Sequence, residues 1–113
     1  RIDADLPADR LTLPTADLLD RLEPFGCGNE RPLLRVRDLP VHSYATMGQD
    51  RAHLKIHLQT PRGVVQALCW GGAGRSRELL AQPRIDLAVC LSVDYWNGAR
   101  RLQVEAKDFR PAT

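Results

Sequence analysis

The sequence lacks the features that mark secreted, membrane-spanning and disulfide-stabilised proteins. Its three cysteines form no Cys-x-x-Cys pair and leave one thiol unmatched, so we expect no disulfide framework. No apolar run approaches the ~18 residues of a transmembrane helix, and the first ten residues have no apolar core of a secretory signal. We therefore expect a cytoplasmic protein with no membrane partner. The absence of an initial methionine indicates a fragment of a longer protein.

The sequence also lacks the motifs of common catalytic sites. His42, His53 and His57 have no serine, cysteine or acid at a spacing typical of nucleophilic catalysis. Residues 71–74 are rich in glycine but lack the lysine of a phosphate-binding P-loop. No paired acidic motif indicates two-metal hydrolysis, and the cysteines and histidines have the wrong spacing for zinc. We expect no catalytic residue, metal ligand or cofactor in this chain.

Charge is distributed unevenly along the 113 residues. Residues 1–30 hold seven acidic and three basic side chains, a net charge of −4, whereas residues 31–113 hold seven acidic and thirteen basic ones, a net of +6. Basic domains attract polyanions, because each neutralised phosphate releases counterions. The fourteen arginines against two lysines can equally reflect genomic base composition, but that does not explain the asymmetry. We predict an interdomain linker with a short helix at 1–30 and a basic domain at 31–113.

Alternating apolar and polar residues after position 33 predict five strands. These are Leu34–Met47, Arg51–Thr60, Val64–Trp70, Ile85–Asp94 and Arg100–Phe109. The first strand is expected to bend near Asp38–Pro40, because proline within a strand implies a bulge. The expected inward side chains include Leu34, Val36, Leu39, Val41, Ala45, Met47, Leu54, Ile56, Leu58, Ile85, Leu87, Val89, Leu91, Val93, Leu102, Val104 and Ala106.

Turn and capping residues predict the connections between these strands. Thr15 is expected to cap a helix that ends before Pro24, giving Thr15–Leu22. Phe25–Asn29 is expected to form a tight connector, and Ser76–Gln82 a second short helix. Asn97-Gly98 is a strong hairpin signal. Residues 1–14 are expected to be ordered only if they dock on another part of the protein.

The predicted order of elements is three strands, a short helix and two strands. A five-stranded barrel with a helix in that position is the plan of the OB fold. SH3-like barrels also have five strands but seldom place a helix there. We therefore predict an all-β fold, a five-stranded OB-fold barrel with a short helix between strands three and four and an N-terminal helical lead-in.

OB barrels bind single strands across the outer face of strands two and three, between the loops that follow strands one and four. Cations hold the phosphates and aromatic rings stack on the bases. The residues expected to bind nucleic acid here are Tyr44, Arg51, His53, Lys55, His57, Tyr95, Trp96, Arg100 and Arg101. Tyr44 is expected to be exposed. Trp96 can equally close the end of the barrel, and Trp70 is expected in the core.

Several motifs along residues 15–110 resemble one family. They are EPFGCGN followed by Pro32-Leu33-Leu34, then His53-Leu54-Lys55, Trp96-Asn97-Gly98 and Leu102-Gln103-Val104. Their order and spacing resemble the C-terminal OB-fold domain of the bacterial RecJ-type single-stranded-DNA-specific exonucleases of the DHH family. The resemblance implies an upstream core that uses Mn²⁺ or Mg²⁺ and an Asp-His-His motif. That core degrades single-stranded DNA from the 5′ end in recombination and repair, while the OB domain helps to clamp the strand.

The resemblance carries over no catalytic residue, because no Asp-His-His motif occurs in this chain. Two other functional hypotheses remain. The domain can be an interaction module for an acidic partner peptide, such as the tail of a single-strand-binding protein. It can also be a structural clamp that closes the nuclease without gripping DNA. Salt-dependent binding to an oligonucleotide favours DNA binding, whereas binding only to an acidic peptide favours the interaction module.

Overall fold

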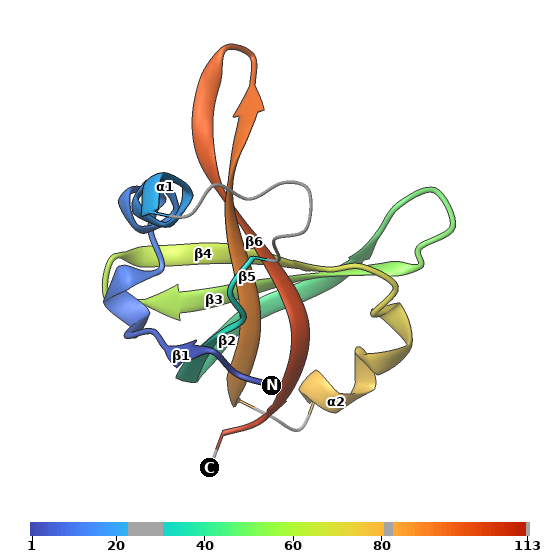
Figure 1. Ribbon diagram of the computed structural model, residues 1–113. Helices are drawn as coiled ribbons and strands as arrows, with labels where there is room; N and C mark the ends of the chain where they lie inside the picture. The colour runs from blue at the N-terminus through green and yellow to red at the C-terminus, as the bar shows by residue number, and fades with distance from the viewer. Residues whose placement is uncertain (23–30, 81–82, 113) are drawn as a thin grey trace.

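A closed barrel of five strands forms the body of the computed structural model, which describes residues 1–22, 31–80 and 83–112. The strands are β2 (Leu34–Met47), β3 (His53–Thr60), β4 (Gly63–Cys69), β5 (Arg84–Trp96) and β6 (Ala99–Pro111). Neighbouring strands follow the order β2–β3–β4–β6–β5, and pairing between β5 and β2 closes the barrel (Figure 1). The all-β, OB-fold prediction is confirmed. The predicted connector Phe25–Asn29 lies outside the described residues.

The N-terminal segment docks on this barrel. A two-residue strand, β1 (Ala4–Asp5), pairs in parallel with the start of β2. The 3-10 helix η1 (Ala8–Arg10) and helix α1 (Leu13–Leu22) follow it. Leu11 and Ala16 belong to the same buried cluster as the barrel strands. The parallel pairing of β1 was not predicted, since two exposed residues carry no alternation that could reveal a strand.

Helix α1 begins two residues earlier than predicted. The Thr15 backbone N–H donates a hydrogen bond to the Thr12 side-chain oxygen at 3.4 Å, so Thr12 caps the helix and the expected cap at Thr15 is wrong. Pro14 then lies in the first turn, where its missing N–H costs no hydrogen bond and its fixed φ angle suits the helix. Pro14 thus marks the start of the helix.

The first long strand has two irregularities. The register of β2 against β5 shifts between Val36 and Leu39, and Asp38 has a φ of 58°, which confirms the predicted bend. The register against β3 shifts again between Val41 and Ser43. A bulge of one residue moves every later side chain to the opposite face of the strand.

The second bulge reverses the predicted orientation of the end of β2. Ala45 pairs with Lys55 and Met47 pairs with His53, so both lie on the outer face, and the prediction that they point inward is wrong. Tyr44 pairs with Ile56 and packs partly buried against the core, so the prediction that it is exposed is also wrong. The predicted alternation did not include the extra residue of the bulge between Val41 and Ser43, so it assigned the later side chains to the wrong faces.

The core consists of the inward side chains of all five barrel strands. Leu54, Ile56 and Leu58 of β3 are each 0% exposed, as their alternation predicted. The predicted inward residues of β5 from Ile85 to Leu91 are also buried, while Val93 and Leu102 are partly buried near one end of the barrel. Burial of this alternating face is the main source of stability in such a barrel.

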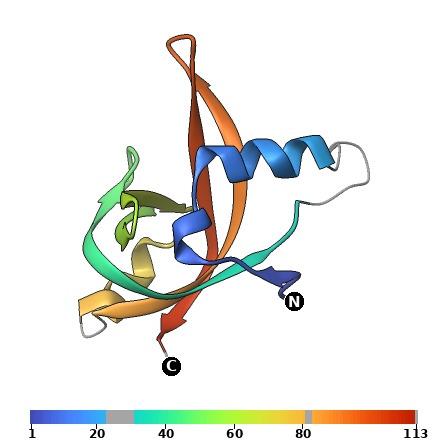
Figure 2. The same cartoon turned by 90° about the vertical axis from the view of Figure 1, so that its left-hand side faces the viewer.

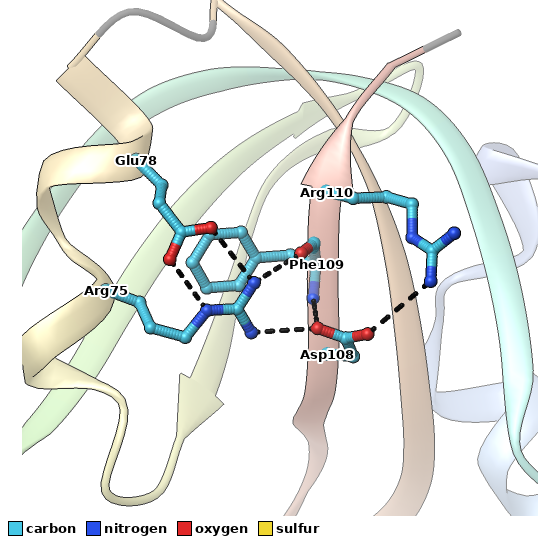
Figure 3. Close-up of polar contacts among 5 residues, drawn as sticks. All are labelled: Arg75, Glu78, Asp108, Phe109 and Arg110. Carbon is cyan, nitrogen blue, oxygen red and sulfur yellow. Dashed lines mark hydrogen bonds and ion pairs between the residues drawn. The ribbon is translucent and has the colours of Figure 1, made fainter.

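Between β4 and β5 lie the 3-10 helix η2 (Ala73–Arg75) and helix α2 (Arg77–Leu80). The predicted helix Ser76–Gln82 is present in shorter form, and residues 81–82 lie outside the described part. Arg75 fastens this segment (Figure 3): its guanidinium donates to Glu78 at 2.9 and 3.1 Å, to Asp108 at 2.8 Å and to the Phe109 carbonyl at 2.7 Å. It also lies 4.1 Å from the centre of the Phe109 ring.

These contacts shift the pKa values of Arg75 and of the two carboxylates that it contacts. The hydrogen bonds from Arg75 lower the pKa of both Glu78 and Asp108, although partial desolvation opposes the shift at each carboxylate. The same bonds, above all those to Glu78, raise the pKa of Arg75. Through these ion pairs and hydrogen bonds, Arg75 links the segment after β4 to the end of β6.

Candidate nucleic-acid interface

The outer face of β3 is continuous with those of its two neighbours. Lys55 pairs with Ala45 of β2 and Leu68 of β4, and His57 pairs in the same way with Ser43 and Gln66. Directly paired residues of antiparallel strands share a face. We call this surface the outer face; it consists of Ser43, Ala45, Met47, His53, Lys55, His57, Gln59, Val64, Gln66 and Leu68.

Trp70 lies at the edge of the outer face beside His53. The two rings are 5.1 Å apart with an interplanar angle of 79°, and the Gly71 backbone N–H donates to Nδ1 of His53 at 2.8 Å. Trp70 is 49% exposed, so the prediction that it lies in the core is wrong. Strand β4 ends at the buried Cys69, and the next residue in the alternation faces outward.

Strands β5 and β6 continue past the barrel as a two-stranded ribbon, residues 93–102, which we call the arm (Figure 1). Asn97 and Gly98 turn the arm with φ angles of 50° and 78°, the hairpin geometry that an Asn-Gly pair predicts. Tyr95 is 70% exposed and Trp96 is 58% exposed. Trp96 therefore does not close the end of the barrel, and the alternative that it stacks on a ligand remains a prediction.

The two faces of the arm carry different residues. Arg101 pairs with Asp94 in the strand register, its Nε lies 3.2 Å from the Asp94 carboxylate, and its guanidinium carbon lies 5.2 Å from the centre of the Trp96 ring. Tyr95 pairs with Arg100 on the opposite face, where Arg100 forms an ion pair with Asp17 of α1. In Figure 2, the turn between β2 and β3 and the arm both point upward, and α1 crosses in front of the arm.

A pocket of about 320 Å³ lies where β4 and the arm separate. Among the described residues, β4 and β6 pair only at Ala67–Val104 and Leu68–Glu105. The two strands separate on the N-terminal side of these pairs. The pocket is lined by Val64, Val65, Gln66, Leu68, Asp94, Arg101, Leu102, Gln103 and Val104. The outer face and the Arg101 side of the arm therefore meet at this pocket.

The structure brings together only part of the predicted site. His53, Lys55 and His57 share the outer face, and Arg101, which lies over the Trp96 ring, lines the adjoining pocket. The other predicted residues lie elsewhere: Arg51 in the exposed β2–β3 turn, Tyr44 on the inner face, and Tyr95 and Arg100 on the far face of the arm.

Sequence reasoning missed several residues of this surface. Gln66 and Leu68 were not predicted, because β4 is apolar on both faces and its orientation was uncertain. Pairing with the unambiguous alternation of β3 could have placed both on the outer face. Gln103 joins the pocket because β6 pairs with β4, a contact between distant strands that no local pattern reveals.

The cations of this surface differ in how they are compensated. Lys55 has no ion-pair partner among the residues that the structure describes, whereas Arg101 is paired with Asp94. Exposed ion pairs contribute only about 0–1 kcal/mol, so an anionic ligand can compete for Arg101. Lys55 is thus the most available cation of the outer face.

The remaining chemistry of the described residues gives no sign of a metal centre or a membrane span. No three His, Cys, Asp or Glu side chains in ranges 1–22, 31–80 and 83–112 gather as ligands. No helix in these ranges has the length and apolar character needed to cross a bilayer.

Comparison with known proteins gives consistent matches. The model of the RecJ OB domain matches residues 2–108. A curated relative, the single-stranded-DNA-specific exonuclease RecJ of Thermus thermophilus, is 33% identical over 89 residues, which cover 79% of this chain and 12% of the relative. The chain therefore spans only a small part of that protein.

Two solved structures of RecJ from Thermus thermophilus also match. The structure with Mg²⁺ has a TM-score of 0.63 and 28% identity, and the match covers 96% of this chain and 16% of that one. The structure with Mn²⁺ has a TM-score of 0.58 and 28% identity, covering 90% of this chain and 15% of that one.

Proposed function

Since this chain belongs to the RecJ OB domain family, whose model matches residues 2–108, we propose that it binds single-stranded DNA for a nuclease core elsewhere in its polypeptide. The bound strand lies across the outer face, between the β2–β3 turn and the arm. Residues 31–113 carry this surface, and residues 1–30 connect it to the preceding domain. The parent is a 5′–3′ single-stranded-DNA exonuclease acting in recombination and repair.

The observation that carries this proposal is that the outer face, which holds Lys55, and the side of the arm that holds Arg101 and Trp96 meet at one pocket. Single-strand binding needs cations along the phosphates and flat rings for the bases. Lys55 supplies an available charge, and Trp70 and Trp96 supply exposed rings at two edges of the surface. The net charge of +6 on residues 31–113 favours a polyanionic ligand.

Cleavage belongs to the part of the polypeptide beyond this chain. The matched RecJ structures hold Mg²⁺ or Mn²⁺, and the parent is expected to use the same ions. The purified 113-residue chain should therefore release no nucleotides from single-stranded DNA with either ion. Robust nucleotide release by highly purified protein would contradict this division of labour.

A titration of oligonucleotides at several salt concentrations tests DNA binding. Affinity should be weak, with little sequence preference, and should fall by about 0.7 log units per log unit of salt for each phosphate contacted. Lys55→Ala should lower this slope by about one contact. The matched control is Lys107→Ala, because the only other lysine of the chain is on β6 and pairs with Glu105.

Three outcomes would contradict the proposal. The first is an equal effect of the two lysine substitutions on the salt slope, which would show that binding depends on overall charge. The second is tight, salt-insensitive, sequence-specific binding. The third is binding to an acidic peptide without binding to DNA, which would favour the interaction module.

A further inference from the structure

The pocket between β4 and β6 lies beside the surface that OB barrels use most, in a gap of the barrel wall. We propose that it receives a single nucleobase of the bound strand. This inference rests on the proposed function and adds a site to it: one base leaves the stack and enters between the two strands. Polar side chains of the pocket bind the edge of the base, and apolar side chains contact its ring faces. These contacts are additional to any contact with phosphate.

The walls of the pocket match the chemistry of a base. Val65, Leu102 and Val104 come from the inner faces of their strands and form an apolar floor against the core. Gln66 and Gln103 add carboxamides to the same lining. The volume of about 320 Å³ falls within the range of ~300–1,000 Å³ that is typical of small-molecule sites. A flat ring with apolar faces and a polar edge suits this combination.

The carboxamides also explain why such a site would not select one base strongly. Each glutamine side chain presents a carbonyl acceptor and an NH₂ donor, and rotation about its last torsion exchanges the two. Gln66 and Gln103 can therefore match the hydrogen-bonding edge of different bases. Binding would then depend on the presence of a base more than on its identity, which agrees with the weak sequence preference expected above.

The charges at the pocket position the strand that carries the base. Arg101 and Asp94 line the pocket, and the Arg101 guanidinium lies over the Trp96 ring. A phosphate next to an inserted base can replace Asp94 as the partner of Arg101, while Trp96 is exposed for stacking of a neighbouring base. Arg101 would thus contact the phosphate, and Gln66 and Gln103 would contact the base.

A cycle of protein and ligand changes tests the inference. Gln66→Leu and Gln103→Leu remove the carboxamides but keep similar side-chain volume. Each variant of the 113-residue chain is titrated with an oligothymidylate and with an abasic strand of equal length, which keeps the phosphates and lacks the bases. The matched control is Gln59→Leu, since Gln59 lies on the outer face but does not line the pocket, so its substitution should act on both strands equally. Thermal melts check that every variant remains folded.

We expect Gln66→Leu and Gln103→Leu each to weaken oligothymidylate binding roughly two- to tenfold, the range for a lost hydrogen bond. Neither should change binding of the abasic strand, whereas Gln59→Leu should affect both ligands equally. Lys55→Ala should weaken both ligands alike, because it acts on phosphate. Equal losses on both strands for the pocket variants, or no loss on either, would overturn the pocket assignment.

The same measurements separate this inference from the proposed function. If the unchanged chain binds neither strand, DNA binding itself is wrong. If it binds both strands with the salt dependence described above but the pocket variants behave like Gln59→Leu, DNA binding stands and only the nucleobase site is excluded.

Discussion

The two halves of the β5–β6 hairpin contrast sharply. In the barrel half, the inward residues of β5 pack into the core, and Leu91 is 2% exposed. In the arm, the same strand places Tyr95 on the same side of its alternation, yet Tyr95 is 70% exposed. Backbone pairing between β5 and β6 continues without a break from Val89 to Trp96. The difference therefore comes from what lies opposite each side chain, not from the strand itself.

From this contrast we infer that one part of the hairpin stabilises the fold and that another part serves the proposed recognition of DNA. An apolar residue stabilises the fold only where other elements cover it. Beyond the barrel, the rings of Tyr95 and Trp96 remain available to a ligand. Four predictions, from the largest expected effect to the smallest, test this separation.

Leu91→Ala should lower the free energy of unfolding by about 2–5 kcal/mol, because it leaves a cavity in a small core. Denaturant titration of the 113-residue chain measures this loss. Oligonucleotide binding, measured where the variant is fully folded, should stay unchanged. A loss below about 0.5 kcal/mol would show that the barrel half of β5 is not the stabilising part.

Arg75→Ala should lower the free energy of unfolding by about 1–2 kcal/mol, because it removes the contacts to Glu78, Asp108 and Phe109. The loss is limited because the Arg75 side chain is partly exposed and solvent screens part of each interaction. The matched control is Arg84→Ala, which breaks a more exposed pair with Asp38 and should cost less. Thermal melts compare the two. Equal losses would show that Arg75 acts only as another surface charge.

Stability should fall at acidic pH, and Arg75 should be one cause. The hydrogen bonds of Arg75 lower the pKa of Asp108 and Glu78 below their ordinary values of 3.8 and 4.5. Their contribution is complete above these values and is lost as pH falls through the lower folded-state pKa values. Melting temperatures from pH 7 to pH 3 should therefore fall less steeply for Arg75→Ala than for the unchanged chain. Parallel curves would contradict the linkage.

Trp96→Ala should change the free energy of unfolding by no more than about 0.5 kcal/mol, as expected for an exposed position. Its effect should appear in binding, where a stacked base is worth ~1–3 kcal/mol. Tyr95→Ala is the control within the arm, because Tyr95 lies on the opposite face and should affect binding less. A large loss of stability in Trp96→Ala would show that the arm packs against the body.

The sequence predicted most of the barrel because period-two alternation is a local property. The pattern at Leu54, Ile56 and Leu58 placed three core residues, and by the same logic it placed Lys55 on the outer face. The Asn97-Gly98 turn was also predicted, since only a few residue pairs adopt its positive φ angles readily. The bulge between Val41 and Ser43 was not, and this single extra residue misplaced Tyr44.

By itself, the sequence determined the strands, the helix between them and the outward position of Lys55, because alternation and turn chemistry act over a few neighbouring residues. Only the tertiary structure decided which outward residues meet. The pocket joins Gln66 to Gln103 because β4 and β6 pair at Ala67–Val104 and Leu68–Glu105 and separate on the N-terminal side of these pairs. The exposure of Trp96 likewise depends on how far the hairpin extends past the barrel. Such contacts depend on closure of the whole barrel, which no short stretch of sequence encodes.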